Sequence, residues 1–121
     1  MSQQLTIPQA IDLALAHHRA GRLQQAEGIY RQILVVQPEH PDALYLLGTL
    51  AHQAGHTPQA IEMLRRAIAV NPAAGNYYVN LGQMLLSSGN LHEAESVTLQ
   101  ALKLSPDSAE ARMNLGAVYR A

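Results

Sequence analysis

Residues 44–72 read LYLLGTLAHQAGHTPQAIEMLRRAIAVNP, and their landmark residues recur along the chain at one constant spacing. The landmarks are a leucine, a glycine, an alanine and a proline, and consecutive copies of each lie 34 residues apart. The copies are Leu13, Leu47, Leu81 and Leu115; Gly21, Gly55 and Gly89; Ala26, Ala60 and Ala94; and Pro38, Pro72 and Pro106. Four residue types that share one period predict an internal repeat whose units bury their apolar faces by stacking.

Each landmark predicts a local structure. Gly21, Gly55 and Gly89 lie between two segments of helical apolar periodicity, where a glycine can end a helix in the left-handed conformation. The prolines end the next helix, because proline lacks an amide hydrogen and clashes with the preceding turn. Each repeat is therefore predicted to be a pair of helices.

A second set of glycines, Gly48, Gly82 and Gly116, lies inside the first helix of a pair, where glycine costs up to about 1 kcal/mol relative to alanine. This cost predicts a close approach of a neighbouring helix. Ala26, Ala60 and Ala94 are the small residues expected on the other side of the contact.

Cap signals agree with the division into pairs. Thr6 with Gln9 and Asn90 with Glu93 have the spacing of a capping box. Thr57-Pro58 predicts a cap followed by proline at the first helical position, and Asp107 with Glu110 predicts the start of the last helix. Helices are expected at 7–20, 22–37, 41–54, 57–70, 75–88, 91–104 and 107–120.

Composition limits the function classes. Of the 121 residues, 48% are hydrophobic and 14% charged, with no Phe and no Trp, which favours a helical core of Ala and Leu over a β-rich one. The net charge of −1 predicts no binding of nucleic acid or of an anionic membrane. No cysteine is present, which excludes disulfides and thiolate chemistry. No signal peptide and no membrane-spanning run are recognised, so the expected location is the cytoplasm.

Several segments resemble the tetratricopeptide repeat. The first-helix signature occurs at Ala10 to His17, Leu44 to Ala51 and Tyr78 to Leu85, and the second-helix signature at Ala26 to Tyr30 and Ala60 to Leu64. The resemblance implies an all-α, right-handed superhelical solenoid of antiparallel helix pairs with about seven helices. It covers one domain, residues 7–121, with repeats at 7–40, 41–74, 75–108 and a partial repeat at 109–121, after a short extension of residues 1–6. Tyr30 and Tyr78 are expected at core positions of the repeat. Thr98 and Arg112 depart from the family pattern, which predicts weaker packing near the C-terminal end without changing the fold.

The resemblance also implies a function. Arrays of this family are usually protein-interaction modules that bind a peptide or protein segment in a concave groove lined by the first helices. The residues expected in the groove are Ile11, Asp12, Leu15, Tyr45, Thr49, His52, Val79, Asn80, Gln83, Met113 and Asn114. Their apolar members suggest either a partner with apolar side chains or packing between successive first helices.

Two asparagines stand out within this set. Asn80 and Asn114 are 34 residues apart, and their amides could pair with the backbone of an extended peptide whatever its sequence. They resemble half of the asparagine ladder in the repeat domain of O-linked N-acetylglucosamine transferases; the other equivalent positions hold Asp12 and Leu46. The alternative is that they are polar residues on a solvated helix face. A clamp for acidic C-termini is not expected, because its basic residues are missing.

No catalytic, cofactor or metal motif is recognised. The glycines follow the repeat period, and His52 and His56, although four residues apart, are separated by Gly55, which is expected to end the helix. The chain is expected not to be an enzyme in itself. Three function classes remain open: a free adaptor, the repeat region of a larger glycosyltransferase, sulfotransferase or methyltransferase, and a self-assembling repeat. Self-association is expected through the last helix, at Leu115, Val118 and Tyr119, or the natural protein is longer. The alternative is that this helix, made more polar by Glu110, Arg112 and Arg120, serves as an imperfect cap of the stack.

Overall fold

The computed structural model describes residues 4–121, and this part of the chain contains seven helices and no strand. The helices are α1 (Ile7–Arg19), α2 (Leu23–Val36), α3 (Pro41–Gln53), α4 (Thr57–Val70), α5 (Gly75–Ser87), α6 (Leu91–Leu104) and α7 (Ala109–Arg120). The expected all-α class is confirmed, and no boundary departs from expectation by more than two residues.

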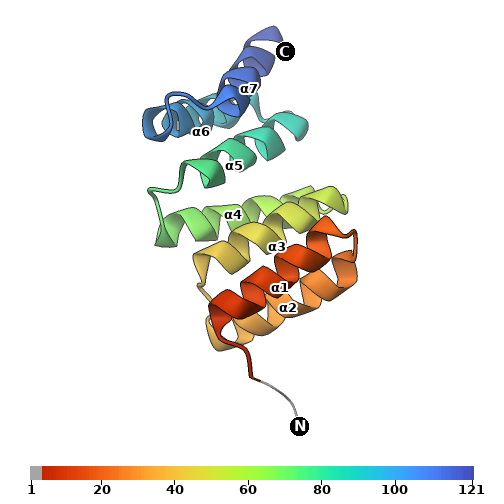
Figure 1. Cartoon of the computed structure of the whole chain (residues 1–121). Coiled ribbons are helices and arrows are strands. Elements are labelled where there is room, and N and C mark those ends of the chain that lie inside the picture. The colour runs from red at the N-terminus through yellow and green to blue at the C-terminus, as the bar shows by residue number, and fades with distance from the viewer. Residues whose placement is uncertain (1–3) are drawn as a thin grey trace.

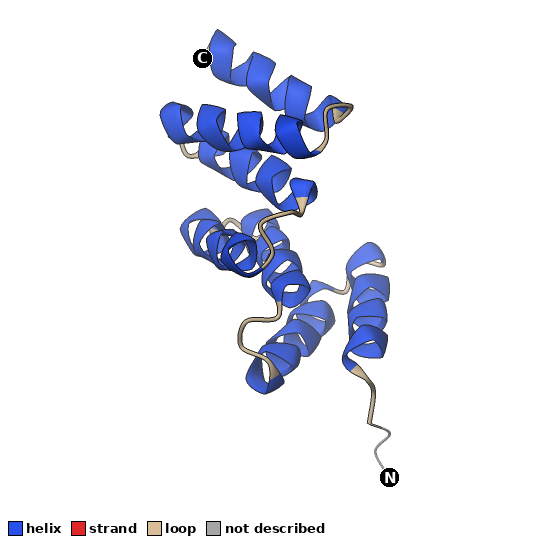
Figure 2. Cartoon of the chain, turned by 90° about the vertical axis from the view of Figure 1, so that its left-hand side faces the viewer, coloured by secondary structure: helices blue, strands red, loops and turns tan. Residues whose placement is uncertain are grey.

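The helices follow one another from one end of the molecule to the other (Figure 1). The most extensive packing lies within the pairs α1–α2, α3–α4 and α5–α6. Each second helix also packs on the next first helix, and α5 contacts both α3 and α7. The side view shows the pairs as successive layers of one stack (Figure 2).

The turn inside each pair contains a glycine in the left-handed region. Gly21, Gly55 and Gly89 have φ values of 82°, 89° and 80°, as expected for a glycine that ends a helix. Outside glycine no described residue has a positive φ. The short turns hold the two helices of each pair antiparallel.

Two of the four expected helix starts are confirmed. Thr6 and Gln9 form a complete capping box, and Oδ1 of Asn90 accepts from the amide of Glu93 at 3.5 Å. The other two expectations are wrong. Thr57 is the first residue of α4 and makes no capping bond, and the cap of α7 is Ser108, whose Oγ accepts from the amide of Ala111 at 3.1 Å.

The close approach at the mid-helix glycines is confirmed inside the stack. A Cβ added to Gly82 would lie 2.6 Å from Oγ1 of Thr98 and 3.8 Å from the carbonyl oxygen of Ala94. One added to Gly48 would clash with Leu64 and lie 3.3 Å from the carbonyl oxygen of Ala60. At these two positions only glycine lets the first helix lie against the second.

The core consists of leucine, alanine and tyrosine side chains between consecutive helices. Tyr30 is fully buried, as expected. The buried tyrosine of α5 is Tyr77, at 1% exposure, and not the expected Tyr78, which is half-buried and donates its hydroxyl to the carbonyl of Pro72 at 2.9 Å. Thr98 stands where the family pattern has a large aromatic residue, and it is completely buried. Its hydroxyl oxygen is therefore a polar atom in the core.

Candidate functional site: the face of the first helices

Two shallow hollows lie along the face that the first helices form. The first, of about 210 Å³, is lined by Ile7, Pro8, Ile11, Asp12, His40 and Asp42. The second, of about 250 Å³, is lined by Tyr45, Gly75, Asn76, Val79, Asn80, Ser105, Ser108 and Glu110. Both combine apolar side chains with carboxylates, and neither lining contains a lysine or an arginine. We call the two hollows together the groove.

A chain of aromatic and polar contacts joins α3 to α5 at the centre of the groove. The hydroxyl of Tyr77 donates to Oδ1 of Asp42 at 2.5 Å. The ring of Tyr77 stacks on that of Tyr45, with the centroids 4.7 Å apart and the planes 27° from parallel. Burial, and next the hydrogen bond to Asp42, raise the pKa of Tyr77 above the usual 10.0. These contacts of Tyr77 with Asp42 and Tyr45 join two consecutive repeats beside the groove.

Asn80 completes this chain of contacts. Its Nδ2 donates to the hydroxyl of Tyr45 at 2.8 Å and to the carbonyl of Asn76 at 3.0 Å. The two amide hydrogens of Asn80 are therefore engaged within the fold, and among residues 4–121 only Oδ1 remains for a ligand.

Asn114 makes an equivalent hydrogen bond, from α7 to α5. Its Nδ2 donates to the carbonyl of Val79 at 3.1 Å, which leaves one hydrogen and Oδ1 for a ligand. Asn80 thus lines the second hollow, whereas Asn114 lines neither hollow, and each asparagine uses part of its hydrogen-bonding capacity to join consecutive first helices.

Several other expected groove residues have structural contacts. Val79 is 7% exposed and packs on Ala101 and Ala111, so that only an edge of its side chain lines the second hollow. Oγ1 of Thr49 donates to the carbonyl of Leu46 at 2.9 Å. Nδ1 of His52 lies 2.9 Å from Oγ1 of Thr57, which draws this ring to the turn between α3 and α4.

The rest of the expected set divides into half-buried and exposed residues. Ile11 and Leu15 are half-buried, while Asp12 and Gln83 are exposed. Met113 is 71% exposed. Ile11, Tyr45 and the edge of Val79 give the groove its apolar surface, whereas Met113 lies outside both hollows.

A row of polar residues at the helix starts was missed as a unit by the sequence analysis. Asp42, Asn76 and Glu110 lie in the first turns of α3, α5 and α7, and all three are exposed. They line the two hollows and are 34 residues apart, so the repeat period itself could have identified them. Carboxylates at a helix N-terminus also favour the helix dipole, which accounts for part of this pattern.

The expected self-association residues of α7 do not share one open face. Val118 is 8% exposed and belongs to the central core with Leu81 and Leu85, so its expected role at the surface is wrong. Leu115 is half-buried, and Tyr119 is 63% exposed. Val118 is buried because it faces back into the stack, whereas most of the Tyr119 side chain is open to solvent.

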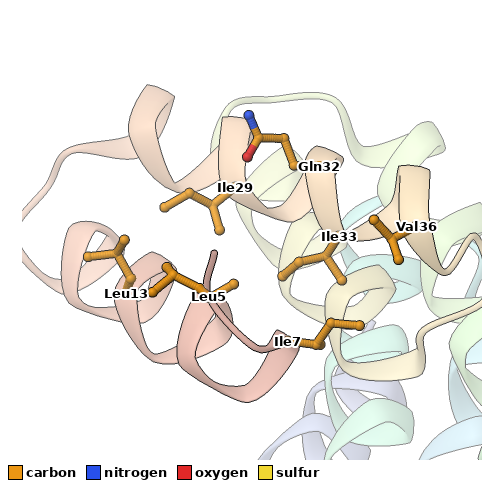
Figure 3. Close-up of a pocket in the computed structure, with 8 residues that line it drawn as sticks. Leu5, Ile7, Leu13, Ile29, Gln32, Ile33 and Val36 are labelled. Carbon is orange, nitrogen blue, oxygen red and sulfur yellow. The ribbon is translucent and has the colours of Figure 1, made fainter. Parts of the chain in front are cut away.

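A separate aliphatic pocket lies between α1 and α2, at the end of the stack opposite α7 (Figure 3). Its volume is about 320 Å³, and Leu5, Ile7, Ala10, Leu13, Ile29, Gln32, Ile33 and Val36 line it. Leu13 is 43% exposed, whereas its equivalents Leu47 and Leu81 are each 2% exposed. Leu47 is covered because it packs with Ala26 and Tyr30 of the preceding second helix.

Two further findings concern other kinds of site. Among the described residues no helix has the length and apolar character needed to cross a membrane. Residues 4–121 contain no group of three or more His, Asp or Glu side chains placed to hold a metal ion.

Comparison with known proteins agrees with the repeat architecture. A family model described as tetratricopeptide repeat matches residues 7–73, and a second model with this description matches residues 53–97 and 85–121. No curated protein matches the sequence.

Three solved structures illustrate the similarity. The first TPR of Spaghetti (RPAP3), bound to the HSP90 peptide SRMEEVD, has a TM-score of 0.89 and 18% identity over 94% of this chain and 90% of its own. The type III secretion chaperone SycD of Yersinia enterocolitica, in complex with a peptide of the translocator YopD, has a TM-score of 0.85 and 20% identity over 98% and 95%. A mutant of the Thermobaculum terrenum O-GlcNAc transferase has a TM-score of 0.82 and 31% identity over 96% of this chain, which spans 23% of that enzyme.

Proposed function

Because the chain belongs to the tetratricopeptide repeat family, we propose that residues 7–121 act as one protein-interaction domain whose groove binds an extended segment of another protein. The observation that carries the proposal is the second hollow, in which residues of α3, α5 and α7 meet around Asn80. Two structurally similar proteins were solved with peptides, which supports this use of the fold.

The partner segment combines basic and apolar side chains. Asp12, Asp42 and Glu110 line the hollows and no cation does, so a positively charged segment is attracted and an acidic one is repelled. Tyr45 and the edge of Val79 supply apolar contact beside Glu110. An acidic segment such as SRMEEVD, which the first TPR of Spaghetti holds, is not expected to bind here.

A pair of matched peptides tests the proposal. We compare amidated, fluorescently labelled SRMEEVD with its basic analogue SRMKKVK by fluorescence anisotropy at low ionic strength. The analogue is expected to bind at least ten-fold more tightly, and added salt is expected to weaken it because the attraction is electrostatic. Glu110→Gln removes a groove charge and is expected to weaken the analogue, whereas the control Glu62→Gln, on α4 and 68% exposed in its side chain, is not. Equal affinities, or tighter binding of SRMEEVD, would contradict the proposal.

One observation favours a second candidate function, the repeat region of a larger transferase. The identity of 31% to the Thermobaculum enzyme extends over 96% of the chain, although the chain spans 23% of that enzyme. In that case the groove presents protein substrates to a catalytic domain, and residues 7–121 remain non-catalytic. The reading frame of the natural gene distinguishes the two candidates directly. In either case the lack of cysteine supports a reducing compartment such as the cytoplasm.

A further inference from the structure

A cleft of about 420 Å³ lies between the second helices α2 and α4, with α3 as its floor. The floor includes Leu47, Leu50 and Ala51, and the flanking helices contribute the polar side chains of Glu27, Arg31 and Gln59. Each of these three helices packs against a neighbour on both sides, so the cleft does not depend on the surfaces at the two ends of the stack. It shares no lining residue with either hollow of the groove.

The equivalent interface one repeat later, between α4 and α6, is filled by apolar side chains. Ile61 and Leu85 stand 34 residues after Glu27 and Ala51, and they are 9% and 1% exposed. Both belong to the central core. At the first interface a carboxylate replaces the isoleucine, and the small alanine replaces the leucine. The cleft therefore corresponds to space that hydrocarbon side chains occupy in the next repeat.

An ion pair also bridges the interface between α4 and α6. Nη2 of Arg65 donates to the two carboxylate oxygens of Glu93, at 2.8 and 2.9 Å. Nη1 of Arg65 donates at the same time to Glu62 of its own helix, at 3.1 Å. One arginine of a second helix therefore holds two carboxylates, one from its own helix and one from the next second helix.

The equivalent arginine at the cleft holds one carboxylate. Nε and Nη2 of Arg31 both lie 2.9 Å from Oε2 of Glu27, on the same helix. The position equivalent to Glu93 is occupied by Gln59, a neutral residue that lines the cleft. Within the described part of the chain, Arg31 thus has no counterpart of the bond that Arg65 makes to Glu93.

We propose that the cleft binds a small aliphatic carboxylic acid in its ionised form, whose carboxylate pairs with Arg31 and whose hydrocarbon chain lies on the apolar floor. The carboxylate corresponds to that of Glu93 at the next interface, and the hydrocarbon chain corresponds to the apolar side chains there. Glu27 does not prevent the pairing, because Arg65 holds two carboxylates and a guanidinium has several N–H donors. The site does not depend on the peptide proposed for the groove.

The size of the cleft favours a small molecule over a helix of a partner protein. An α-helix is about 10 Å wide and rises about 5.4 Å per turn, so a single turn occupies about 400 Å³. The cleft, at about 420 Å³, has room for no more than that. Sites for small molecules have volumes of about 300–1,000 Å³ and combine an apolar lining with a few polar groups that fix the orientation of the ligand.

Octanoate is the probe, and octylammonium, with the same chain length and the opposite charge, is its control. We titrate each into the 15N-labelled chain and follow the amide resonances by NMR. Octanoate is expected to shift the resonances of Ala51 and Gln59 and to leave those of Leu85 and Glu93, at the filled interface, unchanged. It is expected to bind about five-fold more tightly than octylammonium, as one exposed ion pair allows.

Three chain variants locate the binding. Ala51→Leu introduces the leucine found one repeat later and is expected to abolish the shift at Gln59 without lowering the melting temperature. Gln59→Glu supplies Arg31 with the equivalent of Glu93 and is expected to weaken octanoate about five-fold, because the new carboxylate competes for the guanidinium. Gln25→Glu makes the same charge change at the equivalent position of α2, which does not line the cleft, and is expected to leave the affinity unchanged.

Several outcomes contradict the proposal. It is wrong if millimolar octanoate leaves Ala51 unshifted, if octylammonium binds equally well, or if Ala51→Leu and Gln59→Glu bind octanoate like the unmodified chain. A shift at Leu13 in place of Ala51 would assign the acid to the pocket between α1 and α2. Tighter binding of an acetylated peptide that ends in leucine would mean that the carboxylate belongs to a protein chain end, and the proposal of a free acid would then fail.

Discussion

Nδ2 of Asn80 donates to the hydroxyl of Tyr45 at 2.8 Å, across the 35 residues that separate α5 from α3. Asn114 makes a bond of the same sequence separation to the carbonyl of Val79, at 3.1 Å. In α5 and α7 the asparagine before the leucine-glycine pair therefore joins the helix to the first helix before it. An amide in this position contributes to the stability of the stack.

Replacing these amides is expected to lower stability. Asn80→Ala and Asn114→Ala should each reduce the free energy of unfolding by about 1 kcal/mol, the net contribution of a typical intramolecular hydrogen bond. Urea denaturation followed by circular dichroism measures the loss. Gln83→Ala, at an exposed position of the same helix as Asn80, is the control and should be neutral. If both asparagine variants leave the midpoint unchanged, the amides act only at the surface.

Two equivalent glycines are expected to respond in opposite directions. Gly82→Ala should destabilise by about 1–3 kcal/mol, because the new methyl group overlaps Oγ1 of the buried Thr98. Gly116→Ala should stabilise by up to about 1 kcal/mol, because alanine favours the helix and Arg120 can move aside. Thermal unfolding of the two variants gives the signs, and a stabilising Gly82→Ala would refute the close contact.

Thr98→Val is expected to stabilise the chain. Oγ1 of Thr98 is buried and has no hydrogen-bond partner within the described part of the chain, so its hydroxyl contributes a desolvation cost of about 1–3 kcal/mol. Valine keeps the shape and removes the cost. The matched control is Thr49→Val, where the hydroxyl donates to Leu46 and its loss should destabilise. Chemical denaturation distinguishes the two outcomes, and a loss of stability in Thr98→Val would contradict the prediction.

Stability is expected to fall at alkaline pH. Burial raises the pKa of Tyr30, Tyr45 and Tyr77 above 10.0, so above this pH the unfolded chain loses tyrosine protons that the folded chain retains. The unfolded state then binds fewer protons, and the free energy of unfolding decreases as pH rises from about 10. Below that pH the contribution of these groups is constant. Tyr77→Phe should flatten the dependence, which urea midpoints between pH 8 and 11.5 can measure.

The repeat period made most of the fold predictable. Local residue preferences predict the positive φ of Gly21, Gly55 and Gly89. They also predict that the second helices end shortly before the repeat prolines, and each of these helices ends two residues before its proline. The exchange of Tyr78 for Tyr77 in the core was not predictable in this way. The ring of Tyr77 packs with Leu44 and Ala67, and its hydroxyl donates to Asp42, an exposed residue 35 positions earlier.

The groove was predictable only as a set of positions. The repeat period places Thr49, His52 and Val79 on the first helices. It does not predict that Thr49 donates to Leu46, that His52 lies beside Thr57 or that Val79 packs on Ala101, because these contacts depend on side-chain rotamers. The prediction of Val118 as a surface residue did not use the repeat period. Its equivalents 34 and 68 residues earlier are Met84 and Leu50, which are 1% and 4% exposed, and Val118 likewise packs in the core with Leu81 and Leu85.

The strictly neighbour-to-neighbour packing of the helices has a kinetic consequence. Almost every tertiary contact joins a helix to the next one or two along the chain, so loop closure demands little entropy and folding can begin in any single pair. Propagation then proceeds outward, and unfolding runs in reverse, starting at the termini where one neighbour is missing. Amide hydrogens of α1 and α7 should therefore exchange with solvent first, while those of α3, α4 and α5 should be released only when the whole chain opens.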